Sequence, residues 1–166
     1  MIIIGFMGAG KTTIGRLLGK QLGMTFLDLD QAIAAEAQMT IPEYFAERGE
    51  KDFRQLELET LKKHLGQQIV LSTGGGCVAT EAVRELLKDQ TNVIYLSSSF
   101  GQVYHRIIND PLNRRPIVQQ KNRQELEALY QDRLPLYEEV ADLTILTDGL
   151  RPWEIANQIK RLSSKL

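Results

Sequence analysis

Short apolar runs alternate with helix-like segments along the whole chain. These runs are too short for helices and are rich in residues that favour strands. They lie at Ile2–Ile4, Thr25–Leu29, Ile69–Leu71, Val93–Leu96 and Leu143–Leu146. Runs that are apolar throughout are typical of parallel strands, which helices cover on both faces. The pattern therefore predicts an α/β fold in which a five-stranded parallel sheet lies between two layers of helices.

Several of the intervening helices carry start and stop signals. Thr40, Pro42 and Glu43 match a capping box with proline in the first turn, so a short helix should begin there and end near Gly49. A second helix should follow directly and run to about His64. Further helices are expected over residues 80–88, 100–108 and 123–134 and at the C-terminal end.

Two residues shape the expected end of the chain. Pro135 cannot donate a helical hydrogen bond, so the helix that begins at Arg123 should give way there. The C-terminal helix carries Trp153 on its apolar face, and a large aromatic side chain in that position is most simply a core anchor.

The first apolar run leads into a glycine-rich stretch with a phosphate-binding pattern. Residues 5–13 read Gly-Phe-Met-Gly-Ala-Gly-Lys-Thr-Thr, which fits G-x-x-x-x-G-K-S/T between a strand and a helix. Glycines let successive backbone N–H groups point at one phosphate, while Lys11 adds a cation and Thr12 a hydroxyl for magnesium. The stretch predicts a nucleotide-phosphate site formed by Gly8, Ala9, Gly10, Lys11, Thr12 and Thr13.

Other polar and glycine-rich segments follow the later strands. Asp28 and Asp30 come at the end of the second strand, the edge of a parallel sheet where ligands bind. We expect the two carboxylates to face different neighbours. Gly74–Gly76 after the third strand indicates a close approach by a ligand or another segment. The turn-rich stretch from Asn109 to Pro116 carries adjacent arginines, as expected of a flap over phosphates.

Composition narrows the function further. The 166 residues are read as one domain, 1–166, and 20 Lys+Arg against 21 Asp+Glu argue against non-specific nucleic-acid or membrane-surface binding. A single cysteine, Cys77, excludes an internal disulfide and a cysteine-based zinc site. No apolar stretch approaches the roughly 20 residues that span a bilayer, and no basic leader is present. We therefore expect a cytosolic protein.

The combination of a phosphate loop, strand-end carboxylates and flap arginines suits phosphoryl transfer. Such a transition state needs positioning and charge neutralisation more than covalent chemistry. The chain is too short for a motor or helicase, and it has no clear N-K-x-D motif, which argues against a GTPase.

Over nearly its whole length the chain resembles the shikimate kinases. The resemblance rests on motifs whose joint order and spacing are specific to that family, although the first motif by itself indicates only a phosphate-loop protein. The motifs are Gly-Phe-Met-Gly-Ala-Gly-Lys-Thr-Thr at 5–13, Asp28-x-Asp30, Gly49-Glu50-x-x-Phe53-Arg54-x-x-Glu57, Gly74-Gly75-Gly76, Arg115-Pro116 and Arg133-x-Pro135-Leu136-Tyr137.

The resemblance implies a nucleoside-monophosphate-kinase-like fold. It also implies transfer of the ATP γ-phosphate to the 3-hydroxyl of shikimate, in the biosynthesis of chorismate and aromatic amino acids. The acceptor-binding segment would be about 30–62 and the mobile lid about 109–121. The partners would be shikimate and ATP, without nucleic acid or membrane, and the enzyme would act as a monomer.

Roles for single residues follow from the same resemblance. Asp30 would contact the shikimate hydroxyls and serve as the base, although it could instead mainly orient the hydroxyl. Arg54 and Arg133 would hold the shikimate carboxylate, an arrangement that suits a guanidinium fork. The backbone of Gly75 would contact the substrate. The nucleotide-side assignments are Thr12 and Asp28 for Mg²⁺, Lys11 and Arg115 for the phosphates, and Leu150 in the adenine loop.

Several alternatives stay open at the level of sequence. Arg106 and Arg114 are both candidates for the arginine that lies against adenine. Arg54 could be a surface arginine paired with Glu50 or Glu57, since such helical pairs are common, and Glu57 could either orient Arg54 or be solvated. A kinase for another polyol acid, such as gluconate, and a non-catalytic nucleotide-binding regulator are the alternative functions.

Overall fold

The fold is built on a five-stranded parallel sheet. The computed structural model describes residues 1–109 and 121–163. The strands are β1 (Ile2–Ile4), β2 (Thr25–Asp28), β3 (Ile69–Ser72), β4 (Val93–Ser97) and β5 (Leu143–Leu146), in the order β2-β3-β1-β4-β5. All four pairings are parallel. The predicted five-stranded parallel sheet is therefore confirmed.

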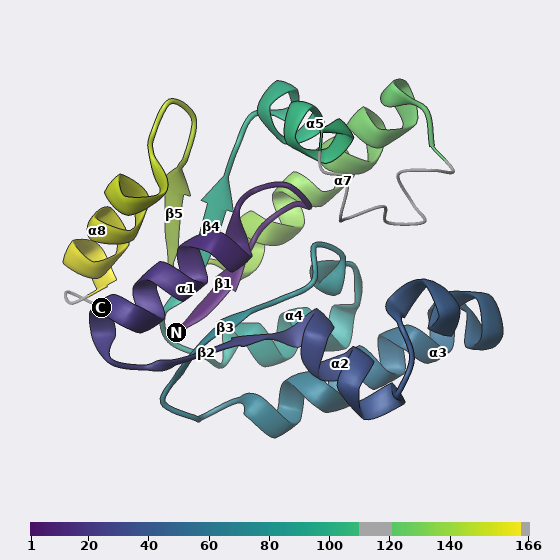
Figure 1. The fold of residues 1–166 in the computed structure, drawn as a ribbon. Coiled ribbons are helices and arrows are strands. Elements are labelled where there is room, and N and C mark those ends of the chain that lie inside the picture. The colour runs from purple at the N-terminus through teal and green to yellow at the C-terminus, as the bar shows by residue number, and fades with distance from the viewer. Residues whose placement is uncertain (110–120, 164–166) are drawn as a thin grey trace.

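Helices cover both faces of this sheet. They are α1 (Lys11–Leu22), α2 (Leu29–Ala37), α3 (Ile41–His64), the short 3₁₀ helix η1 (Cys77–Ala79), α4 (Glu81–Lys88), α5 (Phe100–Ile108), α7 (Arg123–Val140) and α8 (Pro152–Ser163). Helices α1 and α8 lie together on one side of the strands, whereas α4 and α7 lie on the other (Figure 1). Helices α2 and α3 extend beyond β2, at the opposite end of the molecule from β5 and α8.

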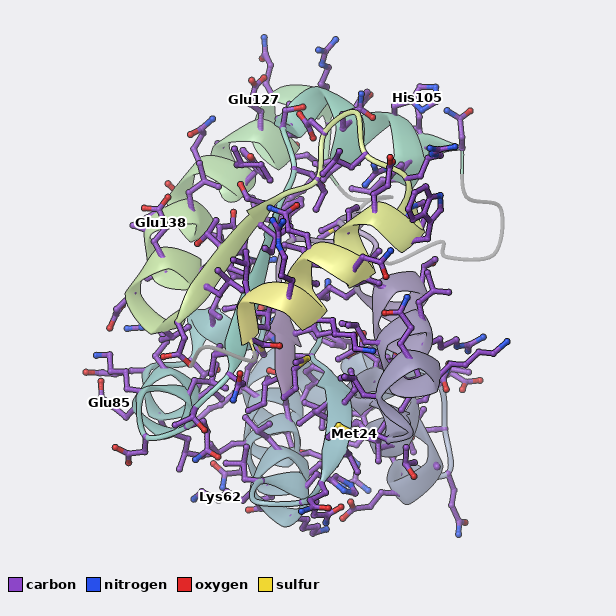
Figure 2. The ribbon with its side chains drawn as sticks, turned by 90° about the vertical axis from the view of Figure 1, so that its left-hand side faces the viewer. Met24, Lys62, Glu85, His105, Glu127 and Glu138 are labelled. Carbon is purple, nitrogen blue, oxygen red and sulfur yellow. The ribbon has the colours of Figure 1, made fainter. Side chains whose placement is uncertain are left out.

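Two cores fill the space between these layers. Because side chains alternate along a strand, Ile3 of β1 faces α1 and α8, while Ile2 and Ile4 face the other side. Charged side chains such as Lys62, Glu85, Glu127 and Glu138 lie on the outer surface, as Figure 2 shows. Within the described residues, no helix is both long and apolar enough to cross a membrane.

The end of β2 differs from the prediction. The strand stops at Asp28, and Leu29 and Asp30 already belong to the first turn of α2. Asp28 is the N-cap of that helix, and its Oδ1 accepts a hydrogen bond of 3.1 Å from the backbone N–H of Asp30. The expectation that Asp28 and Asp30 share one strand end is therefore wrong, because the capping carboxylate turns the chain into a helix.

The two helices expected around Gly49 are present as the two parts of α3. The capping box of Thr40 and Glu43 is formed, with Pro42 in the first turn. Gly49 interrupts the helix with φ 79° and ψ 172°, a left-handed backbone that favours glycine. Helix α3 therefore consists of a short segment before Gly49 and a longer one after it, and the longer one begins just before Arg54.

Helix α7 is longer than predicted, because Pro135 does not end it. The proline ring lies on the exposed side of the helix, where water can bond the carbonyl that the missing N–H leaves open. On the buried side, Arg133 and Tyr137 are both anchored to the carbonyl of Gly75. These tertiary bonds anchor the helix on both sides of the proline.

Trp153 also departs from the prediction, since it is 48% exposed and is not a core anchor. The guanidinium of Arg151 lies 4.8 Å from the centre of its ring. A cation over the ring face stabilises a partly exposed indole. The buried residues of α8 are Ile155, Ala156 and Ile159 instead.

Candidate active site

The loop after β1 curls around the start of α1. Gly8 and Gly10 have φ values of 77° and 92°, which the tight curl requires and which other residues rarely adopt. Lys11 is buried, and its Nζ donates hydrogen bonds to the carbonyls of Gly5 at 2.8 Å and Phe6 at 3.0 Å. The ammonium group is thus held within the loop, next to backbone N–H groups at the N-terminus of a helix, which is a favourable place for phosphate.

A contact between Thr12 and Asp28 joins this loop to the end of β2. Thr12 Oγ1 donates a hydrogen bond of 2.8 Å to Oδ2 of Asp28. A hydroxyl and a carboxylate are the hard oxygen donors that Mg²⁺ prefers, and Mg²⁺ commonly takes only one or two protein oxygens besides water and phosphate. Thr12 and Asp28 therefore fit a magnesium site with one or two protein ligands. No larger group of His, Cys, Asp or Glu that could hold a metal occurs in the part of the chain that the structure describes.

The three glycines after β3 lie at the centre of the site, because several segments approach their backbone closely. A Cβ added at Gly74 would lie 2.6 Å from Asp30 Oδ1 and 3.0 Å from Glu57 Oε1. At Gly75 it would lie 2.8 Å from the backbone nitrogen of Met7 in the phosphate loop, and at Gly76 2.6 Å from Arg54 Nη2. The glycines therefore permit the acceptor-side residues to gather beside the phosphate loop.

Arg54 is held in this place by two carboxylates on its own helix. Its Nη1 donates to Glu57 Oε2 at 2.8 Å and its Nη2 to Glu50 Oε1 at 3.2 Å. Glu57 is only 1% exposed, whereas Glu50 is exposed. Burial raises the pKa of Glu57, although the charge of Arg54 offsets part of that effect. Burial is the largest single effect on Arg54 and tends to lower its pKa, but the charges and hydrogen bonds of Glu57 and Glu50 together outweigh it, so the net shift is upward.

Arg133 enters the same region from α7. Only 6% of it is exposed, and its Nη1 donates a hydrogen bond of 3.1 Å to the carbonyl of Gly75. Its Nε is buried and has no hydrogen-bond partner among the described residues. A buried donor without a partner is costly, so this atom is suited to an oxygen of a bound ligand.

The structure therefore brings together most of the residues that the sequence indicated for the acceptor. Asp30, Arg54 and Arg133 all border Gly74–Gly76, although they come from α2, α3 and α7. Because β3 lies next to β1 in the sheet, the glycines and the phosphate loop are adjacent as well.

The structure describes only some of the residues assigned to the lid and the adenine loop. Arg114 and Arg115 lie outside the described residues. Arg106 on α5 donates from Nη1 to the carbonyl of Gly8 at 3.1 Å, which brings its guanidinium onto the phosphate loop. Leu150 is 37% exposed, on the connection from β5 to α8. Asp148 in the same connection accepts from the backbone N–H of Ser99, so it joins this connection to the one after β4.

Two contributions to the site were not resolved by sequence reasoning. The sequence does not decide the role of Glu57, because a carboxylate three residues from an arginine has the same spacing whether its side chain is buried or solvated. Tyr137 was only part of a motif, although its spacing of four residues from Arg133 would have indicated that both lie on one face of a helix. Cys77 takes no such part, since burial raises the pKa of its thiol to about 12.

Comparisons with known proteins identify the family of this chain. A family model described as shikimate kinase matches residues 7–163. A shikimate kinase from Enterococcus faecalis is 43% identical over 159 residues, which cover 96% of this chain and 95% of that protein. One from Streptococcus thermophilus is 41% identical over 162 residues, covering 96% of this chain and 97% of that protein.

Solved structures give the same result. A shikimate kinase from Acinetobacter baumannii in complex with shikimate has a TM-score of 0.92 and 38% identity, covering 99% of this chain and 92% of that chain. A gluconokinase from Sinorhizobium meliloti has a TM-score of 0.58 and 14% identity, covering 99% and 93%, so it shares the fold alone. The family match, the curated relatives and the shared architecture together show that this chain belongs to the shikimate kinase family.

Proposed function

We propose that this chain transfers the γ-phosphate of ATP to the 3-hydroxyl of shikimate, which yields shikimate 3-phosphate and ADP. One observation carries the proposal: Asp30, Arg54 and Arg133 converge on the glycines that lie against the phosphate loop. Shikimate carries a carboxylate and three hydroxyls. Two guanidinium groups and one carboxylate, held beside the donor phosphate, are the complement of that molecule.

In the proposed complex, Arg54 and Arg133 bind the shikimate carboxylate. Glu57 and Glu50 fix the Arg54 guanidinium through Nη1 and Nη2, and its remaining N–H groups would bind the ligand. The unpartnered Nε of Arg133 and its remaining Nη atom would complete the contact with a carboxylate oxygen. Asp30 accepts a hydrogen bond from the hydroxyl that is phosphorylated, and the backbone of Gly75 limits how deeply the ring can enter.

On the donor side, the phosphate loop from Gly8 to Thr13 would bind the β- and γ-phosphates through backbone N–H groups. Lys11 neutralises phosphate charge, and Arg115 would add a second cation from the lid. Thr12 and Asp28 would hold Mg²⁺, which supplies further neutralisation of the phosphate oxygens when bound. Arg106 lies against the loop and would reach the nucleotide, and the connection around Leu150 would border adenine.

Asp30 can assist the transfer in two ways. As a base, it takes the proton of the attacking hydroxyl; as an orienting group, it only points the oxygen at phosphorus. A loose transition state needs little proton transfer before the new bond forms, so orientation is the minimum role. All of these groups belong to one chain, so we further propose that the enzyme acts as a monomer.

The proposal is tested by measuring ADP release with shikimate, gluconate, AMP and no acceptor. We expect turnover with shikimate only, because the two arginines select a carboxylate, which AMP lacks, and the family match favours shikimate over gluconate. Preference for gluconate or AMP, or release without an acceptor, would overturn the assignment. ATP binding without turnover on any acceptor would instead identify a nucleotide-binding regulator.

A further inference from the structure

Tyr137 is a buried side chain of the site to which the proposed transfer assigns no role. Its hydroxyl lies 2.6 Å from the carbonyl oxygen of Gly75. Its ring is fully buried and stacks on that of Tyr95, with centroids 4.9 Å apart. Burial raises the pKa of Tyr137, so the phenol stays protonated and donates this hydrogen bond. The side chain is therefore fixed both by its ring and by its hydroxyl.

In the proposed complex, the Gly75 peptide that Tyr137 holds would lie between the phosphate loop and the acceptor. Its α-carbon is packed against the backbone of Met7 in the phosphate loop. Its carbonyl accepts hydrogen bonds from Tyr137 and also from Arg133, and these two donors can use both lone pairs of the oxygen. Arg133 and Tyr137 are four residues apart, so they reach the carbonyl from the same face of α7.

We infer that Tyr137 is a positioning residue for the acceptor: its hydroxyl fixes the Gly75 peptide, and through the shared carbonyl the Arg133 guanidinium, relative to the phosphate loop. The inference rests on the proposed function, because it takes Arg133 as a ligand of the shikimate carboxylate. Without the phenol, the carbonyl would keep Arg133 as its donor and could rotate with it. The guanidinium would then meet the acceptor in a wider range of orientations.

Tyr130 offers a matched control on the same helix. Its ring is also buried, and its hydroxyl donates to a backbone carbonyl, that of Ser98, at 2.8 Å. Tyr137→Phe and Tyr130→Phe therefore each delete one buried hydroxyl-to-carbonyl bond and keep the ring. A purely structural role predicts the same outcome for both: a similar loss of stability in chemical unfolding and no specific change in kinetics.

The positioning role predicts a difference. In Y137F the KM for shikimate should rise about 3- to 10-fold, the change that corresponds to the loss of one net hydrogen bond. The KM for ATP and kcat should stay within about twofold, since the phosphate loop keeps its own contacts. Y130F should leave the KM for shikimate unchanged. Assays are run at a temperature at which circular dichroism shows both variants to be folded.

A second measurement asks whether Tyr137 acts through Arg133. Calorimetric titration with shikimate should show that Y137F weakens binding in the wild-type background but not in an Arg133→Ala background. Equal shikimate KM values in Y137F and Y130F, or a full effect of Y137F without Arg133, would overturn the inference and leave the proposed function standing. A wild-type chain that does not phosphorylate shikimate would overturn both.

Discussion

Thr12 Oγ1 donates a hydrogen bond of 2.8 Å to Oδ2 of Asp28, which joins the first turn of α1 to the end of β2. The other oxygen of Asp28 accepts from the backbone N–H of Asp30. One carboxylate therefore links the phosphate loop to the start of the acceptor segment. In the proposed complex, the distance between the donor phosphate and Asp30 would depend on this side chain as well as on the backbone.

Asp28→Asn should distinguish the helix-capping role of this carboxylate from its proposed role in magnesium binding. Asparagine caps a helix about as well as aspartate, so the free energy of unfolding should change little. It lacks the charge for magnesium, so the Mg²⁺ concentration that gives half the maximal rate should rise about 10- to 100-fold. Magnesium titrations of the initial rate measure this shift, with the exposed Asp89→Asn as control. An unchanged magnesium dependence would remove Asp28 from the metal site.

Asp30→Asn tests the group that we propose to contact the acceptor hydroxyl. If Asp30 takes the proton, kcat should fall about 10²- to 10⁴-fold, while the KM for ATP stays nearly constant. If it only orients the hydroxyl, the fall should be smaller and the KM for shikimate should rise. Steady-state kinetics with each substrate varied in turn distinguish these outcomes. Turnover at the wild-type rate would exclude Asp30 from the mechanism.

Gly74→Ala should harm catalysis more than stability. Its Cβ would lie 2.6 Å from Asp30 Oδ1 and 3.0 Å from Glu57 Oε1, and both are side-chain ends that can move aside. The fold can absorb that movement, but the displaced carboxylates should lower kcat/KM for shikimate by about tenfold or more. Gly101→Ala is the matched control, because its Cβ would meet no atom within 4 Å. Equal activity of the two variants would show that the carboxylates near Gly74 are not held in a required position.

Glu57→Gln should change how stability depends on pH. Burial raises the pKa of Glu57 above its ordinary value of 4.5, so the folded state holds this proton more tightly than the unfolded state does. Its contribution to stability is present below pH 4.5 and is lost as the pH rises through the raised pKa. Relative to the variant, the wild type should lose at most about 1.4 kcal/mol per pH unit in that window.

Urea unfolding of both proteins between pH 4 and 8 measures this difference. Glu59→Gln, an exposed change on the same helix, is the control and should follow the wild type. Parallel stability curves for wild type and Glu57→Gln would mean that Glu57 has its ordinary pKa in the folded protein.

The sequence predicted those features that are set by local pattern. The strands were predicted because consecutive residues such as Val93 and Ile94, whose side chains point to opposite faces of the sheet, are both apolar. Burial of the sheet between two layers of helices requires this pattern. The phosphate loop was found because its glycines have a fixed spacing. The capping box at Thr40 and Glu43 was found because it is complete within four residues.

The features that were missed depend on partners far along the chain. Helix α7 continues through Pro135 because Gly75, 60 residues earlier in the sequence, anchors residues on both sides of the proline. The burial of Glu57 depends on how α3 packs beside the glycines, which helical spacing alone does not define. Trp153 can lie partly exposed at the surface because the Arg151 guanidinium covers its ring.

The contacts of Lys11 bear on which anions the phosphate loop accepts. Its ammonium is already bonded to the carbonyls of Gly5 and Phe6. An incoming anion must therefore compete with two carbonyl dipoles for the lysine. Chloride or a single weakly basic oxyanion gains little from that exchange, whereas a chain of phosphates that also occupies the backbone N–H groups gains much more. We therefore expect the loop to favour nucleotides over the small anions that are abundant in a cell.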